Sequence, residues 1–155
     1  MKKISIFFIL LFLNSLFQAS VFGINPEKEI IFSIDLKKNI NSTTWLYIQK
    51  GFNEAEELNS SRIIIEMNTY GGEVNFADSI RTKILNSKIP VVVFIDNNAA
   101  SAGALISIAC DKIYMRRGAT IGAASVVDQT GQKMPDKYQS YMRATMRATA
   151  EFHGK

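Results

Sequence analysis

The sequence predicts an α/β fold with a mostly parallel β-sheet and flanking helices built from repeated β-α units. Short apolar runs typical of buried strands occupy residues 29–35, 63–67, 91–95 and 111–115. These runs alternate with segments in which apolar residues recur at helical spacing, and such alternation favours parallel strands joined by right-handed crossovers. The composition agrees, because 47% of the 155 residues are hydrophobic and 21% are charged, enough apolar material for a core.

Four helices are expected between and after these strands. The first has N-cap residues at Asn41–Thr44, and the second follows a Gly71-Gly72 loop. The segment 119–124 consists mostly of small residues and contains glycine, and we assign no helix or strand to it. The four predicted helices span residues 41–58, 75–86, 101–110 and 135–152.

The N-terminus has the pattern of an export signal. Lys2 and Lys3 precede an apolar stretch at residues 4–17, which is too short to span a bilayer comfortably, and Val21-Phe22-Gly23 offers a cleavage site. We therefore expect residues 1–23 to be a signal peptide or, alternatively, an uncleaved anchor. Residues 24–155 would form one domain that is exported, on the periplasmic or extracytoplasmic face of the membrane.

Ser101 is the candidate nucleophile. It follows the third predicted strand, begins a new apolar helix, and is flanked by the small residues Ala99-Ala100 and Ala102-Gly103. A serine held at a sharp strand-to-helix turn is typical of hydrolases, and the backbone N–H of Ala102 would face a developing oxyanion. The alternative interpretation is a serine selected only to cap the helix.

The glycine pair Gly71-Gly72 follows the second strand, so it should lie at the same sheet edge as Ser101. Glycines let bare backbone N–H groups approach a reacting carbonyl, which makes the pair a candidate for part of an oxyanion hole. A simple turn is the alternative. A phosphate-binding loop is disfavoured because neither GxGxxG nor GxxxxGK[ST] occurs.

Lys137 is the candidate general base. It follows Met134-Pro135-Asp136, a helix-start pattern, and the positive end of the helix dipole disfavours a charged lysine there. We expect partial burial in addition, because both effects favour the neutral amine that can accept a proton from serine. Lys133 is the competing base, and a solvated surface lysine is the alternative interpretation.

Other kinds of site are disfavoured. Cys110 and His153 are the only cysteine and histidine, so an intrachain disulfide is excluded, and zinc-ligand spacing and a convincing Ser-His-Asp triad are lacking. We expect neither a metal nor a cofactor. The net charge of +4 is modest and its lysines and arginines are scattered, which argues against nucleic-acid binding.

The matching motifs lie at residues 64–72, 89–92, 99–104, 113–115 and 118–124, in the order found in a known group. From about Ile30 to its end the chain resembles the NfeD family of ClpP-class, membrane-associated serine proteases, which includes the stomatin-operon partner proteins. The resemblance implies a ClpP/crotonase-like fold and an endopeptidase that cleaves apolar polypeptide segments. It also implies a homo-oligomer, a dimer or larger, with a stomatin-like membrane protein as a candidate substrate.

By this resemblance Ser101 would be the nucleophile and Lys137 the base of a Ser-Lys dyad. One glycine of Gly71-Gly72, together with Ala102, would form the oxyanion hole. Tyr70 stands where the family usually has proline. The chain stops at Lys155, where the family continues, so we expect residues 24–155 to be a C-terminally truncated ClpP-like protease domain.

Three alternatives remain open from the sequence. A signal peptide peptidase A-like protease would share the dyad and the export. An enoyl-CoA hydratase-like lyase would share the fold, but the leader and the absence of acidic residues at 99–104 disfavour it. A non-catalytic scaffold for membrane protein assembly would keep the fold without turnover.

Overall fold

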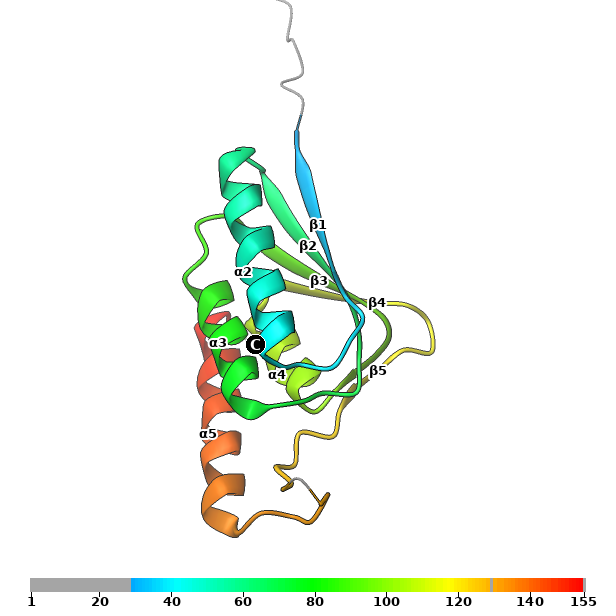
Figure 1. Cartoon of the computed structure of the whole chain (residues 1–155), viewed down its shortest axis with the longest axis vertical. Coiled ribbons are helices and arrows are strands. Elements are labelled where there is room, and N and C mark those ends of the chain that lie inside the picture. Colours follow the sequence, from blue (N-terminus) through cyan, green and yellow to red (C-terminus); the bar gives the residue numbers. More distant parts are fainter. Residues whose placement is uncertain (1–28, 129, 155) are drawn as a thin grey trace, which may run out of the picture.

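Parallel strands form the centre of the fold in residues 29–128 and 130–154, the part of the chain that the computed structural model describes (Figure 1). The expected signal peptide at residues 1–23 lies outside this part. The strands occur in the spatial order β1-β2-β3-β4, and β5 pairs with the last residues of β3. Their bounds are Ile31–Leu36 (β1), Arg62–Thr69 (β2), Val91–Ala100 (β3), Lys112–Met115 (β4) and Thr120–Gly122 (β5).

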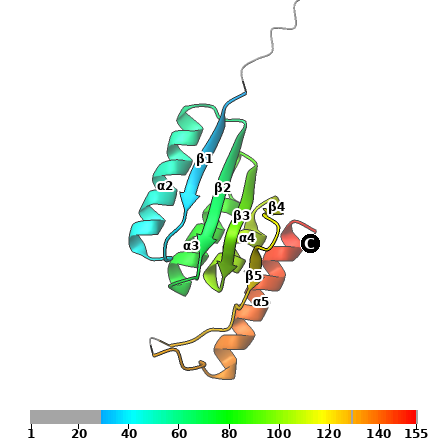
Figure 2. The ribbon, with the colours of Figure 1, turned by 90° about the vertical axis from the view of Figure 1, so that its right-hand side faces the viewer.

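The helices cover one face of this sheet, as Figures 1 and 2 show from two directions. The predicted cap of the first helix is confirmed, because the Thr44 N–H donates to Oδ1 of Asn41 at 3.0 Å. The last helix packs on α4 and carries the predicted Lys137 in its first turn. The helices are Ser42–Glu57 (α2), Val74–Leu85 (α3), Ala102–Ala109 (α4) and Asp136–Phe152 (α5).

The core lies between the sheet and these helices. Strand β2 shows why, since Ile63, Ile65 and Met67 are fully buried while the alternating Ile64 and Glu66 are only partly buried. The opposite sheet face carries no helix in the described part, and Ile31 and Tyr114 on it are 53% and 54% exposed. Other large side chains of the core are Ile34, Leu36, Ile48, Phe52, Ile80, Ile95, Leu105 and Ile106.

Two sequence predictions need correction. Strand β3 does not end at Ile95 but continues to Ala100, and residues 120–122 form a strand where none was predicted. The two differences have one cause: residues 98–100 pair in parallel with residues 120–122. Small residues carry no hydrophobic periodicity, so pairing alone defines these strand segments. Within the described residues, no helix has the length and apolar character needed to cross a membrane.

Candidate active site

Ser101 occupies a sharp turn between β3 and α4. Its φ of 53° and ψ of −114° lie in a region that L-residues other than glycine rarely adopt. Such a conformation costs on the order of 1–3 kcal/mol and is found where the surrounding structure enforces it. Here the Ser101 N–H donates to the carbonyl oxygen of Gly122 at 2.7 Å, so β5 holds the turn in place.

The hydroxyl of Ser101 is available for chemistry. Ser101 stands at the N-cap position of α4, yet its side chain makes no capping hydrogen bond and Oγ has no hydrogen-bond partner in the described part of the chain. The residue is partly exposed and lines a cavity of about 40 Å³ together with Gly72 and Ala102. The capping interpretation therefore does not account for this serine.

Gly71 brings the loop after β2 against Ser101. Its φ is +112°, and a Cβ atom placed on it would lie 2.6 Å from Cβ and 3.1 Å from Oγ of Ser101, so only glycine fits. The polar groups of Gly71 are already used. Its N–H donates to Oγ1 of Thr69 at 3.1 Å, and its carbonyl oxygen accepts from the Ile40 N–H at 2.8 Å.

Gly72 differs from its neighbour because its N–H has no acceptor among the described residues. A Cβ on Gly72 would overlap the backbone of Ile40, so this position also requires glycine. The Ala102 N–H likewise has no acceptor in the described part of the chain, since the first residue of a helix has no intrahelical acceptor. Two unpaired donors thus come from residues that line the Ser101 cavity.

Lys137 lines a separate groove of about 810 Å³ between α3, α5 and the loop before α5. Its Nζ lies 5.0 Å from the ring centroid of Tyr138 and makes no hydrogen bond to Ser101. The predicted partial burial is wrong for this chain: Lys137 is exposed, because α5 buries few of its side chains. The alternative base, Lys133, lines neither this groove nor the Ser101 cavity.

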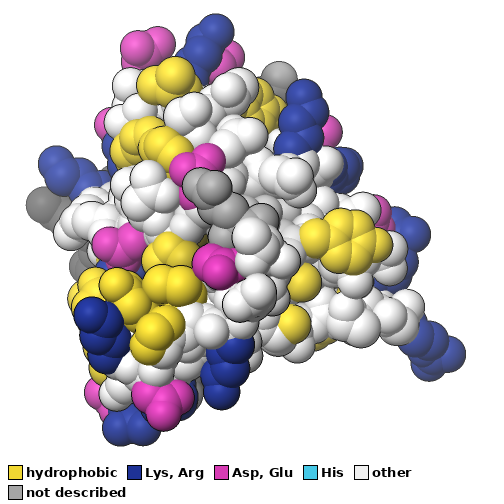
Figure 3. Space-filling view, turned by 60° about the horizontal axis from the view of Figure 1, so that its bottom comes forward, with side chains coloured by type: hydrophobic (Ala, Val, Ile, Leu, Met, Phe, Trp, Pro, Cys, Tyr) yellow, Lys and Arg dark blue, Asp and Glu magenta, His cyan; other side chains and the backbone are white. Residues whose placement is uncertain are grey.

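The groove and the Ser101 cavity adjoin each other. Figure 3 looks onto this end of the molecule and shows hydrophobic side chains in patches among charged ones. Two carboxylates, Asp78 and Asp128, also line the groove. Hydrogen bonds, foremost from the Thr130 hydroxyl, hold the pKa of Asp128 below its ordinary value. The residues shared by the two hollows are Val74, Leu105, Val126, Val127 and Met142.

The remaining candidate residues lie away from this site. A ring nitrogen of His153 is 2.8 Å from the carbonyl oxygen of Ala109, at the end of α4 opposite to Ser101. Cys110 is buried beside it. Among residues 29–128 and 130–154, no group of three or more His, Cys, Asp or Glu side chains is suited to hold a metal ion.

Sequence reasoning missed two residues that shape the site. Thr69 fixes the glycine loop by accepting from the Gly71 N–H and donating to the carbonyl oxygen of Lys38 at 2.8 Å. Gln139 binds the loop before α5. A threonine two residues before a glycine pair is a weak turn signal, and a glutamine inside an amphipathic helix gives none.

Comparison with known proteins identifies the family of this chain and two of its relatives. The family model described as "NfeD1b, N-terminal domain" matches residues 30–155. The membrane protein NfeD1b of Bacillus subtilis (strain 168) is 32% identical over 142 residues, which cover 89% of this chain and 32% of that protein. The membrane-bound protease PH1510 of Pyrococcus horikoshii is 32% identical over 136 residues, with coverages of 83% and 31%. The chain thus spans about a third of each relative.

Solved structures show the same relationship. The 1510-N membrane-bound stomatin-specific protease from P. horikoshii, as a lysine-to-alanine variant in complex with a substrate peptide, superposes with a TM-score of 0.76 at 31% identity, over 81% of this chain and 61% of that one. A serine-to-alanine variant of it gives 0.75. ClpP1 from Listeria monocytogenes, 18% identical with a TM-score of 0.61 over 79% of each chain, shares the fold. The predicted ClpP-like fold is confirmed.

Proposed function

The chain belongs to the family of NfeD1b N-terminal domains and is 32% identical over 136 residues to a membrane-bound protease, and we propose that it is a serine endopeptidase with a Ser101-Lys137 dyad. One observation carries the proposal. The unpaired Ser101 hydroxyl sits at a strained turn, in a cavity also lined by Gly72 and Ala102, whose N–H groups have no acceptor among the described residues. A strained serine beside free amide donors is an arrangement that favours acyl transfer.

The proposed reaction proceeds in two steps. Oγ of Ser101 attacks the scissile carbonyl carbon while the neutral amine of Lys137 takes the hydroxyl proton, and the N–H groups of Gly72 and Ala102 stabilise the oxyanion. The C–N bond then breaks, the protonated Lys137 gives its proton to the leaving amine, and an ester on Ser101 remains. Water, deprotonated by Lys137, hydrolyses this ester and frees the carboxyl product.

The substrate would be an apolar polypeptide segment. The groove beside the cavity is lined mainly by apolar side chains, including Met134, Tyr138 and Tyr141, and it shares five lining residues with the cavity. One relative is named a stomatin-specific protease, so a stomatin-like membrane protein is a candidate substrate. Both named sequence relatives are membrane proteins, and with the leader this supports an exported, membrane-associated domain.

Assembly into an oligomer would give Lys137 the buried surroundings that a general base requires. Lys137 is exposed in the single chain and directed over Tyr138, whereas a neutral amine needs a drier setting. We propose that a homo-oligomer, a dimer or larger, covers this turn of α5. A non-catalytic scaffold is the second candidate, and the missing hydrogen bond between Ser101 and Lys137 favours it.

The test compares cleavage of an unfolded apolar-rich polypeptide by the 155-residue chain and its variants. Ser101→Ala and Lys137→Ala should each lower kcat by roughly 10³-fold or more. The matched controls Ser140→Ala and Lys133→Ala, at exposed positions, should retain the parent rate. Cleavage that survives Ser101→Ala would refute the assignment. A folded, assembled parent without activity would support the scaffold.

A further inference from the structure

Gln139 is a buried polar side chain for which the proposed reaction has no use. It lies in α5 two residues after Lys137, and only 5% of its surface is exposed. Its amide oxygen accepts from the Val126 N–H at 3.1 Å. Its amide nitrogen donates to the carbonyl oxygens of Val126 at 2.6 Å and of Met134 at 3.1 Å. Both amide hydrogens and one acceptor site are therefore used.

The loop that Gln139 binds connects the two halves of the proposed dyad. It begins after Gly122, whose carbonyl oxygen holds the Ser101 N–H, and it ends at Pro135, the residue before α5. Within it, Val126 lines both the Ser101 cavity and the groove that Lys137 lines. A shift of this loop would therefore move the wall of the cavity and the first turn of α5 together.

Other contacts shape this loop without fixing it to α5. The Met134 N–H donates to the Val126 carbonyl oxygen at 3.0 Å, and Asp128 accepts from Thr130 and Gln132. All of these bonds join residues of the loop to one another. In the described part of the chain, Gln139 makes the only side-chain hydrogen bonds between α5 and residues 123–128 and 130–134.

We propose that Gln139 is a positioning residue, which holds Val126 against the first turn of α5 and thereby fixes the position of Lys137 in the groove that adjoins the Ser101 cavity. The effect of Gln139 on catalysis rests on the proposed function. An apolar side chain of similar length would bury the Val126 N–H without an acceptor, which is unfavourable. A glutamate would place an unprotonated oxygen against the carbonyl oxygens of Val126 and Met134.

The first measurement is independent of catalysis. In the 155-residue chain, Gln139→Met should accelerate amide hydrogen exchange at Val126 at least tenfold relative to the parent. The matched control is Gln132→Met, because Gln132 lies in the same loop with an exposed side chain that makes no hydrogen bond to a described residue. Unchanged protection of the Val126 amide in Gln139→Met would overturn the proposal.

The second measurement separates positioning from folding. Gln139→Met should lower kcat about tenfold or more with a smaller change in KM, and Gln132→Met should not. For Gln139→Glu, the ratio of its kcat to that of the parent should rise as the pH falls, because a protonated carboxyl can again donate one hydrogen bond. A pH-independent ratio, or faster Val126 exchange with full activity, would overturn the positioning role.

Different results would refute the proposed protease function and the proposed role of Gln139. Cleavage that survives Ser101→Ala refutes the proposed protease, while the exchange rate at Val126 still tests whether Gln139 holds the loop. Cleavage that needs Ser101 but tolerates Gln139→Met refutes only the positioning role. If Gln139→Met does not fold, the pH dependence of Gln139→Glu decides between these outcomes.

Discussion

At the scale of single residues, the site depends on backbone conformations that the sequence only partly discloses. The glycine pair and the serine were recognisable from their spacing after two strands. The sequence did not reveal which glycine has an unpaired N–H, because the Gly71 N–H donates to Thr69 and this hydrogen bond requires the folded loop. The strain at Ser101 was equally hidden, since it follows from pairing with Gly122.

Gly71→Ala should remove cleavage and destabilise the fold by about 1–3 kcal/mol. The added Cβ would meet Ser101 at 2.6 Å and would stand on a backbone with φ of +112°. Gly118→Ala is the matched control, because Gly118 also has a positive φ, +87°, but no atom lies within 4 Å of its Cβ position. Chemical unfolding and cleavage rates measure the two effects. Equal losses of activity in both variants would contradict the close approach of Gly71 to Ser101.

Asp128 should make the stability of the protein sensitive to acid. Hydrogen bonds from the Thr130 hydroxyl and the Gln132 N–H lower its pKa from the ordinary value of 3.8, so its contribution is complete above that value and disappears as the pH falls through the lower folded value. In urea unfolding, the difference between the parent and Asp128→Ala should therefore be present at pH 7 and shrink below about pH 4. A difference that grows on acidification would contradict this assignment.

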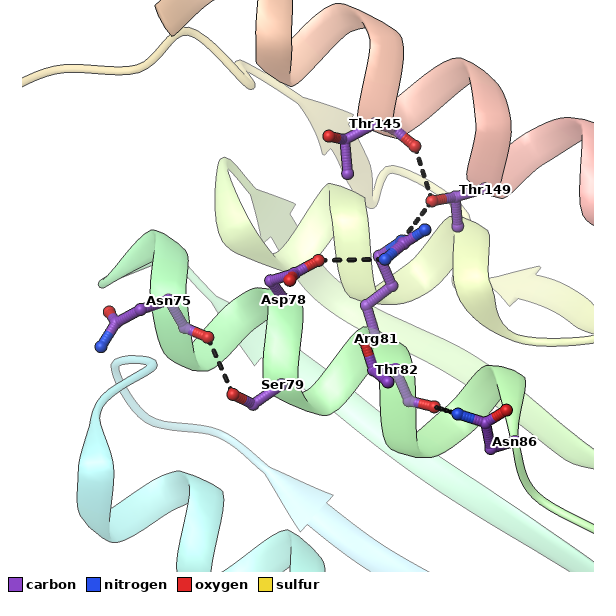
Figure 4. A network of polar contacts seen from close by, with 8 residues as sticks. All are labelled: Asn75, Asp78, Ser79, Arg81, Thr82, Asn86, Thr145 and Thr149. Atoms are coloured by element: carbon purple, nitrogen blue, oxygen red, sulfur yellow. Dashed lines mark hydrogen bonds and ion pairs between the residues drawn. The ribbon is translucent and has the colours of Figure 1, made fainter.

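At the scale of secondary-structure elements, α5 is attached to the domain by few contacts. Its buried residues are Gln139, Met142 and Thr149. Figure 4 shows how α3 reaches it: Nε of Arg81 donates to Oγ1 of Thr149 at 2.5 Å, and an Arg81 guanidinium nitrogen lies 3.0 Å from Oδ1 of Asp78. The sequence predicted both helices, yet it could not predict this bond, which joins residues 68 positions apart.

Arg81→Met should destabilise the protein by about 1–3 kcal/mol, because it removes a charge-assisted hydrogen bond to a fully buried hydroxyl. The matched control is Arg143→Met, an exposed arginine on α5 itself, which should change the free energy of unfolding by less than about 0.5 kcal/mol. Urea unfolding measures both. Equal effects would show that α5 does not depend on its contact with α3.

At the scale of the whole molecule, the order of strands and helices followed from hydrophobic periodicity, because each alternating segment buries one face. Hydrophobic periodicity did not predict the end of β3 or any of β5, because residues 98–100 and 120–122 become strands only by pairing with each other. The position of Lys137 relative to Ser101 was also beyond the sequence, because it depends on how far α5 packs onto α4. Hydrophobic periodicity thus predicts the helices and strands, whereas the pairing of β3 with β5 and the packing of α5 on α4 determine the geometry of the site.

Because helices cover only one face of the sheet in the part of the chain that the structure describes, neighbouring residues of one strand should differ sharply in their contribution to stability. Ile65 is fully buried beneath the helices, so Ile65→Ala should cost about 2–5 kcal/mol. Ile64 points to the opposite face, where it lines a shallow hollow with Phe94 and Tyr114, so Ile64→Ala should cost clearly less. Urea unfolding of the 155-residue chain at several protein concentrations measures both losses. Equal losses, or a loss for Ile64→Ala that grows with protein concentration, would show that another copy covers this face in solution.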